Sequence, residues 1–308
     1  KGDIPIGVSR NSADAWVAPS LFNLDSQAGA PPDDFSATGQ NWGFPTYNWA
    51  EMAKDGYAWW KARFTKMAEY FDAYRIDHIL GFFRIWEIPD TAVEGLPGHF
   101  NAALPFTPDD LARYDFAFDE KRHAKPYIRG YMLPEIFGIY AGEVQAKYLK
   151  PIGNAFCLRE EVDNQQKINT LLGDIYDAKA QVIKEGLFRL TDEILFVRDP
   201  YAAYAWHPRI NAQDTYSFKD LPADMQRDFQ RLHDDFYYHR HDEFWRNEAL
   251  KKLPALVLST DMLVCGEDLG MIPHCVPDVM NRLQILSLEI QRMPKEPYCE
   301  FGDTRKYP

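Results

Sequence analysis

The chain has 308 residues, of which 46% are hydrophobic and 15% aromatic, so it is long enough for one large domain or two ordinary ones. Its net charge of −12 comes from 34 basic and 46 acidic residues, with no stretch dense in Lys and Arg. This balance argues against nucleic acid or an anionic membrane as a partner. The aromatic content fits rings that stack on sugar faces, although large core side chains are the commoner explanation.

The cysteines and the chain ends set further limits. The four cysteines are Cys157, Cys265, Cys275 and Cys299. They show neither a CxxC pair nor a Cys/His ligand spacing, so we expect reduced thiols in a cytoplasmic protein and no metal or other cofactor. No apolar run approaches the roughly 20 residues that a membrane-spanning helix needs. Because the chain opens on Lys1, with no signal peptide, and ends without tail character, we expect a fragment cut at both ends.

The first predicted elements follow the order strand, loop, helix, strand. Residues 4–8 form a short apolar run that ends in polar residues, which predicts a buried strand. Residues 30–49 are rich in Pro and Gly and carry several aromatics, so we expect a long functional loop. Large apolar residues recur every three or four positions over 52–71, which predicts an amphipathic helix, and 73–76 is the next expected strand. This order predicts a right-handed crossover between parallel strands.

The chain then changes character before this pattern returns. Residues 95–240 carry helical runs near 165–193 and 224–245 without a recognisable catalytic feature, so we expect an inserted subdomain there. After it, the expected elements are helices at 244–256 and 276–283 and strands at 262–265 and 286–291.

The predicted fold class is α/β: a partial TIM (β/α)8 barrel, truncated at both ends, with a mostly helical insertion. Its expected divisions are a barrel portion over 1–98, the insertion over 99–240 and a second barrel portion over 241–308. The C-terminal ends of the strands form the active-site face of such a barrel. Asp77 and Glu267 each follow a predicted strand, so we expect them to converge on that face.

Two carboxylates at strand ends suit glycosyl transfer with retention of configuration. Asp77 would attack the anomeric carbon, while Glu267 would protonate the departing oxygen and then deprotonate the incoming one. The two carboxyl groups should then lie about 5 to 5.5 Å apart. Arg75 lies on the same strand face as Asp77 and would keep it ionised. His78 would donate a hydrogen bond to a sugar hydroxyl.

Each of these residues also has a purely structural explanation. Asp77 could form a buried salt bridge with Arg75, and Glu267 could cap the loop that follows it. His78 could be a satisfied core histidine. Phe35 and Trp42 could pack within their own loop instead of covering glucose rings. The structural explanations would have to hold at two separate strand ends, which favours the catalytic interpretation.

Three motifs, in this order along the chain, resemble those of the 4-α-glucanotransferases, glycoside hydrolase family 77, which include amylomaltases and disproportionating enzymes. Residues 33–43 are similar to the family's substrate loop, 73–89 to its nucleophile region and 266–270 to its acid/base strand end. The insertion is similar to that of the plant-type cytosolic disproportionating enzymes. The resemblance implies that Asp77 is the nucleophile and Glu267 the general acid/base.

The same resemblance implies a set of substrate-binding residues: Arg75, His78, Asp33, Phe35, Gln40, Trp42 and Gln291. The family's third catalytic carboxylate, an Asp in a His-Asp pair at a later strand end, finds no counterpart before Pro308. The pairs His233-Asp234 and His241-Asp242 are interpreted instead as solvated helix faces.

The activity implied by the resemblance is transfer of glucosyl or oligoglucosyl units from maltose or malto-oligosaccharides to glucan acceptors. One rival is an α-glucan hydrolase, which shares the covalent intermediate but resolves it with water. Another is a non-catalytic glucan-binding protein built on an incomplete barrel. A metal-dependent barrel hydrolase is disfavoured, because His78 is the only histidine near a predicted strand end.

Overall fold

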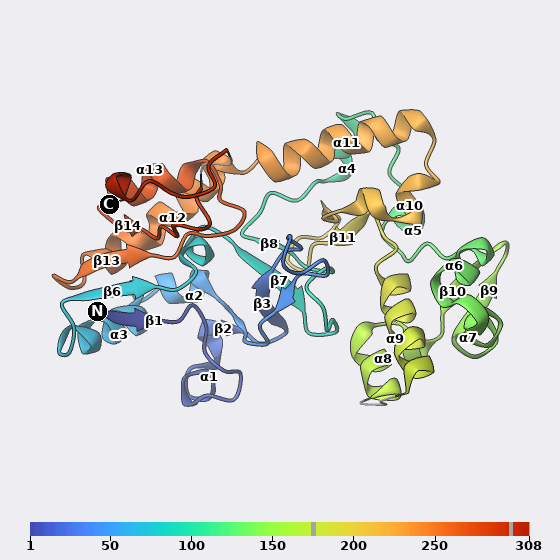
Figure 1. The fold of residues 1–308 in the computed structure, drawn as a ribbon, viewed down its shortest axis with the longest axis horizontal. Helices are drawn as coiled ribbons and strands as arrows, with labels where there is room; N and C mark the ends of the chain where they lie inside the picture. Colours follow the sequence, from blue (N-terminus) through green and yellow to red (C-terminus); the bar gives the residue numbers. More distant parts are fainter. Residues whose placement is uncertain (174–176, 296–297, 308) are drawn as a thin grey trace.

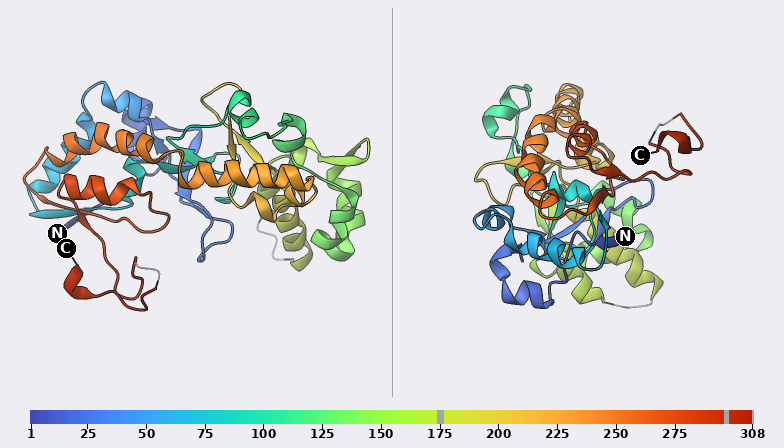
Figure 2. Two further views of the ribbon diagram at one scale, coloured as in Figure 1. Left: turned by 90° about the horizontal axis from the view of Figure 1, so that it is seen from above. Right: turned by 90° about the vertical axis from the view of Figure 1, so that its left-hand side faces the viewer.

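The computed structural model describes residues 1–173, 177–295 and 298–307. The molecule is elongated, and both termini lie at the same end of it (Figures 1 and 2). A parallel sheet and its helices form this end, and an antiparallel sheet lies in the middle (Figure 1). The opposite end holds the helices α6 (Leu133–Phe137), α7 (Ala141–Tyr148), α8 (Gln165–Leu172) and α9 (Ala178–Thr191).

A four-stranded parallel sheet has the strand order β1-β6-β13-β14. Its strands are β1 (Gly2–Ile4), β6 (Ala73–Ile76), β13 (Leu263–Gly266) and β14 (Leu286–Ser287). Ile76 pairs with Ile4 on one side and with Gly266 on the other. The predicted α/β class and the parallel pairing of the first two strands are therefore confirmed. Because all four strands run the same way, their C-terminal ends meet at one edge.

Two of these strands are shorter than predicted. The first was expected at 4–8, whereas β1 ends at Ile4 and the chain leaves the sheet at Pro5. Proline has no N–H to donate to a neighbouring strand, so it fits poorly into the hydrogen-bond ladder. The strand expected at 286–291 ends at Ser287, which leaves Gln291 outside the sheet.

Three helices lie at the same end of the molecule as the parallel sheet: α3 (Ala58–Ala68), α12 (Asp242–Val257) and α13 (Cys275–Arg282). Helix α3 buries Trp60 and Phe64, and the ring of Phe64 lies 4.8 Å from that of Tyr74 on β6. Helix α12 contacts both α3 and α13, and α13 contacts β14. The apolar face predicted from residues 52–71 thus packs against β6, the strand that Asp77 follows.

Helical runs predicted as continuous are interrupted. The run at 52–71 breaks where Gly56 and Tyr57 take left-handed backbone angles, with φ of 69° and 64°. The run at 165–193 ends its first helix at Gly173, whose φ is 48°. Glycine adopts such angles without steric cost, and apolar spacing on either side cannot reveal the turn. The first break separates α2 (Trp49–Ala53) from α3, and the run predicted at 224–245 divides at residues 239–241 into α11 (Ala223–Tyr238) and the beginning of α12.

An antiparallel sheet behind the substrate loop was not predicted. Its strands, in spatial order, are β4 (Gln40–Asn41), β3 (Ser26–Ala30), β7 (Ile85–Pro89) and β8 (His99–Asn101). A two-stranded pair, β2 (Phe22–Asn23) with β5 (Thr46–Tyr47), lies beside it. Residues 30–49 are therefore not a continuous loop, because β4 and β5 fix both sides of the Trp42 segment.

The remaining elements lie around two separate hydrophobic cores. They are α1 (Ala13–Val17), α4 (Pro108–Ala112), α5 (Glu120–His123), α10 (Tyr216–Lys219) and the hairpins β9 (Leu149–Ile152) with β10 (Ala155–Leu158) and β11 (Phe196–Arg198) with β12 (Trp206–Pro208). The second core draws its buried residues from 128–216, whereas Phe196, Phe229 and Phe236 belong to the main core. The domain divisions given above stay a prediction.

The histidines of the two His-Asp pairs are buried, which corrects the expectation of solvated helix faces. His233 lies between the rings of Phe229 and Tyr237, and burial lowers its pKa to about 4. His241 is 1% exposed and stacks on Trp245 at 4.6 Å, and burial lowers its pKa to about 3. The apolar spacing along α11 places His233 on its core face, which the charged neighbours had concealed.

No helix within the described ranges combines the length and the apolar character needed to traverse a bilayer. Cys157, Cys265 and Cys275 are thiols outside any disulfide.

Candidate active site

The two candidate catalytic carboxylates stand side by side at the C-terminal edge of the parallel sheet. Asp77 follows β6 and donates its backbone N–H to the carbonyl of Ile4, at 3.0 Å. Glu267 follows β13 and donates its N–H to the carbonyl of Ile76, at 2.9 Å. Because these bonds extend the ladder by one residue on each strand, both side chains leave the sheet at the same level.

A cleft of about 460 Å³ opens at this edge. Its lining residues are Pro5, Ile6, Gly7, Trp42, Phe44, Asp77, His78 and Glu267. Phe44 and the 5–7 segment were not predicted as part of the site. Gly7 lies so close to Phe44 that a Cβ atom at residue 7 would be 2.1 Å from the Phe44 ring, which explains the glycine there. The aromatic residues at the alternate positions 42 and 44 are the feature of the sequence that could have indicated Phe44 as part of the site.

Glu267 is largely buried, and backbone N–H groups hold both of its oxygens. Oε1 accepts from Leu269 at 2.9 Å, and Oε2 accepts from His78 at 3.0 Å. Burial raises the pKa of Glu267, an effect that these two hydrogen bonds oppose and the charge of Asp77 reinforces. A carboxyl group in this environment holds its proton to a higher pH than usual, as a general acid requires.

Asp77 has the opposite environment. Its side chain is 41% exposed, and Oδ1 lies 2.8 Å from Nη2 of Arg75. The other terminal nitrogen of Arg75 donates to both oxygens of Asp3 at 3.0 Å. Burial acts to lower the pKa of Arg75, but Asp3 and Asp77 together raise it. The ion pair with Arg75 holds the open carboxylate of Asp77 in place beside the cleft.

His78 connects the two carboxylates through its backbone. Its φ of 46° and ψ of 59° are left-handed, and they precede a 3-10 helix at Ile79–Phe82. A non-glycine residue in this conformation is uncommon and often marks a functional site. This turn directs the N–H of His78 to Glu267. Burial, with a smaller contribution from Arg84, lowers the pKa of the His78 ring to about 3, so the ring is neutral.

Trp42 brings the predicted substrate loop to the cleft. Its ring meets the ring of His78 edge-on at 5.0 Å and stacks with that of Phe44 at 5.8 Å. Its indole N–H donates to Oε1 of Gln40 at 3.1 Å. The loop therefore contacts the residue that follows Asp77, while Gln40 itself points its amide at Trp42 and stays outside the lining.

Three other predicted substrate residues lie away from the cleft lining. Phe35 is 78% exposed. Asp33 accepts the backbone N–H groups of Phe35 and Ser36, which closes a turn at the tip of the loop. Gln291 lies beyond β14, and its carbonyl accepts the N–H of Gly302. The structure thus brings Asp77, Glu267, His78 and Trp42 together at the cleft, with Arg75 beside Asp77. Asp33, Phe35 and Gln291 do not lie in the cleft lining.

A parallel α/β sheet with two carboxylates at adjacent strand ends has the layout of an enzyme that acts on glycosidic bonds. The sequence model of the 4-alpha-glucanotransferase family, glycoside hydrolase family 77, matches residues 1–308. The chain belongs to this family.

Known proteins show the same relationship over all or part of the chain. A rice protein (Oryza sativa subsp. japonica) named 4-alpha-glucanotransferase DPE2 is 47% identical over 313 residues, which cover 100% of this chain and 33% of that protein. A 4-alpha-glucanotransferase of Aquifex aeolicus is 42% identical over 145 residues, covering 40% of this chain and 29% of that protein. The chain thus spans about a third of the length of the rice relative.

Among solved structures, an amylomaltase from Corynebacterium glutamicum matches with a TM-score of 0.42 and 15% identity, over 97% of this chain and 22% of that one. This TM-score is too low to assign a fold.

Proposed function

We propose that the protein is a retaining 4-α-glucanotransferase that acts on maltose or malto-oligosaccharides through a covalent glycosyl-enzyme intermediate. Membership of the family supports the activity, and one observation carries the mechanism: an Arg-paired, open Asp77 and a buried Glu267 line the same cleft. We further propose that the parallel sheet is part of a (β/α)8 barrel. A cytoplasmic location, expected from the cysteine pattern, belongs to the same proposal.

In the first half-reaction, the carboxylate of Asp77 attacks the anomeric carbon of the donor glucose. The C1–O4 bond breaks as Glu267 gives its proton to the leaving oxygen, so the reducing-side sugar departs as a neutral alcohol. The raised pKa of Glu267 keeps that proton available, and Arg75 stabilises the charge on Asp77 before the attack. The product is a β-linked glycosyl ester on Asp77.

In the second half-reaction, the 4-hydroxyl of an acceptor sugar replaces the ester. Glu267, now ionised, takes the hydroxyl proton, and the bond to Asp77 breaks as the α-linkage forms. The aromatic pair Trp42 and Phe44 covers one wall of the cleft. An apolar wall at this place favours a sugar face over water, which supports transfer rather than hydrolysis.

Incubation of the full-length protein with maltotriose tests the proposal. Transfer yields glucose together with longer oligosaccharides at a constant number of reducing ends, whereas hydrolysis raises that number. Asp77→Asn should abolish nearly all turnover and still bind oligosaccharide. Asp72→Asn, the same change at the exposed opposite end of β6, is the matched control and should keep wild-type activity. If Asp77→Asn kept more than about a tenth of the rate, its role as nucleophile would be refuted.

The non-catalytic alternative makes a different prediction for the same assay. A glucan-binding protein on an incomplete barrel would bind maltotriose and leave both its chain length and its reducing ends unchanged in the wild type.

A further inference from the structure

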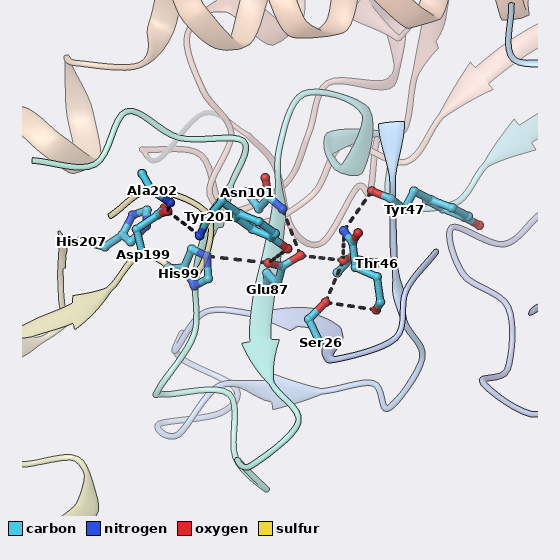
Figure 3. Close-up of polar contacts among 11 residues, drawn as sticks. Ser26, Thr46, Tyr47, Glu87, His99, Asn101, Asp199, Tyr201, Ala202 and His207 are labelled. Carbon is cyan, nitrogen blue, oxygen red and sulfur yellow. Dashed lines mark hydrogen bonds and ion pairs between the residues drawn. The ribbon is translucent and has the colours of Figure 1, made fainter. Parts of the chain in front are cut away.

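A second polar cluster lies in the middle of the molecule, between β8 and the β11–β12 hairpin (Figure 3). His99 begins β8, His207 lies in the centre of β12, and Asp199 follows β11. One potential ligand atom from each of these three residues lies within 4.8 Å of the other two. The histidine rings face each other at 4.4 Å between centroids. The cluster was not predicted from the sequence, because neither of the two strands that carry its histidines was expected.

The histidines of this cluster lack the partners that buried polar groups normally have. His99 is 5% exposed, and neither of its ring nitrogens has a hydrogen-bond partner among the described residues. His207 is 1% exposed, and its Nδ1 likewise has none within the described ranges. Nearly all buried polar atoms in folded proteins are satisfied, so unsatisfied ones call for an additional ligand.

The carboxylates around these rings are already oriented. Oδ1 of Asp199 accepts the backbone N–H groups of Tyr201 and Ala202, which leaves Oδ2 to face Nε2 of His207 at 2.8 Å. Glu87 places Oε1 3.8 Å from Nε2 of His99. Figure 3 shows Glu87 and Asp199 on either side of the His99 ring.

Further hydrogen bonds fix Glu87. Its Oε1 accepts the Tyr201 hydroxyl at 2.6 Å, and its Oε2 accepts Thr46 at 2.6 Å and Asn101 at 3.0 Å. Such outer hydrogen bonds are what orients the ligands of a metal centre.

We propose that His99, Asp199 and His207 bind a divalent transition-metal ion of the zinc type, with Glu87 beside His99 as an outer carboxylate. Two imidazoles with carboxylates suit Zn²⁺ and its neighbours in the first transition row, whereas Ca²⁺ and Mg²⁺ prefer all-oxygen sites. A cavity of about 110 Å³ borders Glu87 and His99 and gives an ion a way in.

The ion would join two parts of the chain that are far apart in sequence. Asp199 and His207 belong to the β11–β12 hairpin, whereas His99 lies on the antiparallel sheet. In that sheet β8 pairs with β7, β7 with β3, and β3 with β4, which holds Gln40. Binding would therefore fasten the hairpin to the sheet that supports the Trp42 loop. We expect a structural role, because the cluster does not line the cleft of Asp77 and Glu267.

Metal analysis of the full-length protein, purified without a polyhistidine tag, tests the site. After removal of metal with a chelator, Zn²⁺ titration against a chromophoric competitor should give about one ion per chain, and unfolding should shift to higher temperature. His99→Gln and His207→Gln should each weaken binding by at least about tenfold. His233→Gln is the matched control, because His233 is also buried with both ring nitrogens unpartnered but lies outside the cluster. It should bind Zn²⁺ like the wild type.

Absence of Zn²⁺ binding to the wild type would overturn the proposal, as would equal binding by His99→Gln or an equal loss in His233→Gln. If the cluster variants do not fold, the wild type loaded with Co²⁺ decides. Visible d–d bands without a thiolate-to-cobalt band support the histidine and carboxylate site. A thiolate band, or no d–d bands, refutes it.

Discussion

Two clusters of carboxylates and histidines differ in how their polar atoms are satisfied. Around Glu267 both carboxylate oxygens accept backbone N–H groups, Arg75 pairs with Asp77, and the cluster opens into a cleft of about 460 Å³. In the part of the chain that the structure describes, the ring nitrogens of His99 have no hydrogen-bond partner, and the adjoining cavity measures about 110 Å³. A satisfied cluster at an open cleft is ready for a substrate, whereas an unsatisfied, enclosed one is completed by a small ion.

The largest effect is expected from Glu267→Gln, which sharpens the assignment of the open cluster. The amide cannot transfer a proton, so transfer from maltotriose should slow by about 10² to 10⁴-fold. A donor with a fluoride leaving group needs no proton from the enzyme and should restore formation of the glycosyl-enzyme, which mass spectrometry detects. The same donor should not rescue Asp77→Asn. Equal rescue of both variants would contradict the division of roles.

At the cluster around His99, the effect that we expect from a substitution is a change in the free energy of unfolding. His99→Leu removes two unpartnered nitrogens, so in metal-free protein we expect it to be neutral or to raise the free energy of unfolding by up to about 1–3 kcal/mol. In excess Zn²⁺ the order should reverse, because only the wild type gains binding energy. Denaturant unfolding with chelator and with Zn²⁺ measures both. A variant that is less stable than the wild type under both conditions would show that His99 acts through packing alone.

Trp42→Ala probes the wall of the cleft. Loss of the ring removes an aromatic contact worth about 0.5–1.5 kcal/mol, so we expect the KM for maltotriose to rise by roughly two- to tenfold. The share of hydrolysis among the products should also rise, since water gains access to the glycosyl-enzyme. Phe35→Ala is the natural comparison, because Phe35 belongs to the same loop but is 78% exposed and outside the lining. Equal effects of the two changes would argue against a specific role for Trp42.

The smallest effect concerns pH. Burial, followed in the same direction by the charge of Asp77, raises the pKa of Glu267 above its ordinary value of 4.5. Glu267 must be protonated in the first half-reaction, so kcat/KM should fall as the pH rises through this raised pKa. Initial rates across the pH range, measured with maltotriose and with the fluoride donor, show whether this fall depends on proton donation by Glu267. The basic limb should be present for maltotriose and absent for the fluoride.

Much of the catalytic edge could be predicted from the sequence. The strand predicted at 73–76 coincides with β6, and the one predicted at 262–265 overlaps β13, because each is a short, mostly apolar run with a carboxylate close behind it. The roles of Asp77 and Glu267 stay a prediction that the cleft geometry supports. Phe35 and Gln291 show the limit, because a resemblance between segments does not say which side chain of a loop faces the cleft.

The antiparallel sheet and the His99 cluster could not be predicted in the same way. Ile85 to Ile88 of β7 are all buried, so the alternation that indicates a strand is absent, and β8 and β12 have only three residues each. His99 and His207 are separated by more than a hundred positions and meet only through the packing of the hairpin on the sheet. Spacing within a sequence detects ligands on one element, not ligands brought together by tertiary contacts.

The left-handed backbone of His78 restricts which residues evolution can place after Asp77. Glycine, asparagine and aspartate tolerate this conformation, whereas a β-branched residue such as valine does not. A drift to valine would turn the peptide N–H away from Glu267 and leave its Oε2 without that donor. An active site can thus be lost in a lineage through a residue whose ring takes no part in the chemistry, with both carboxylates still in the sequence.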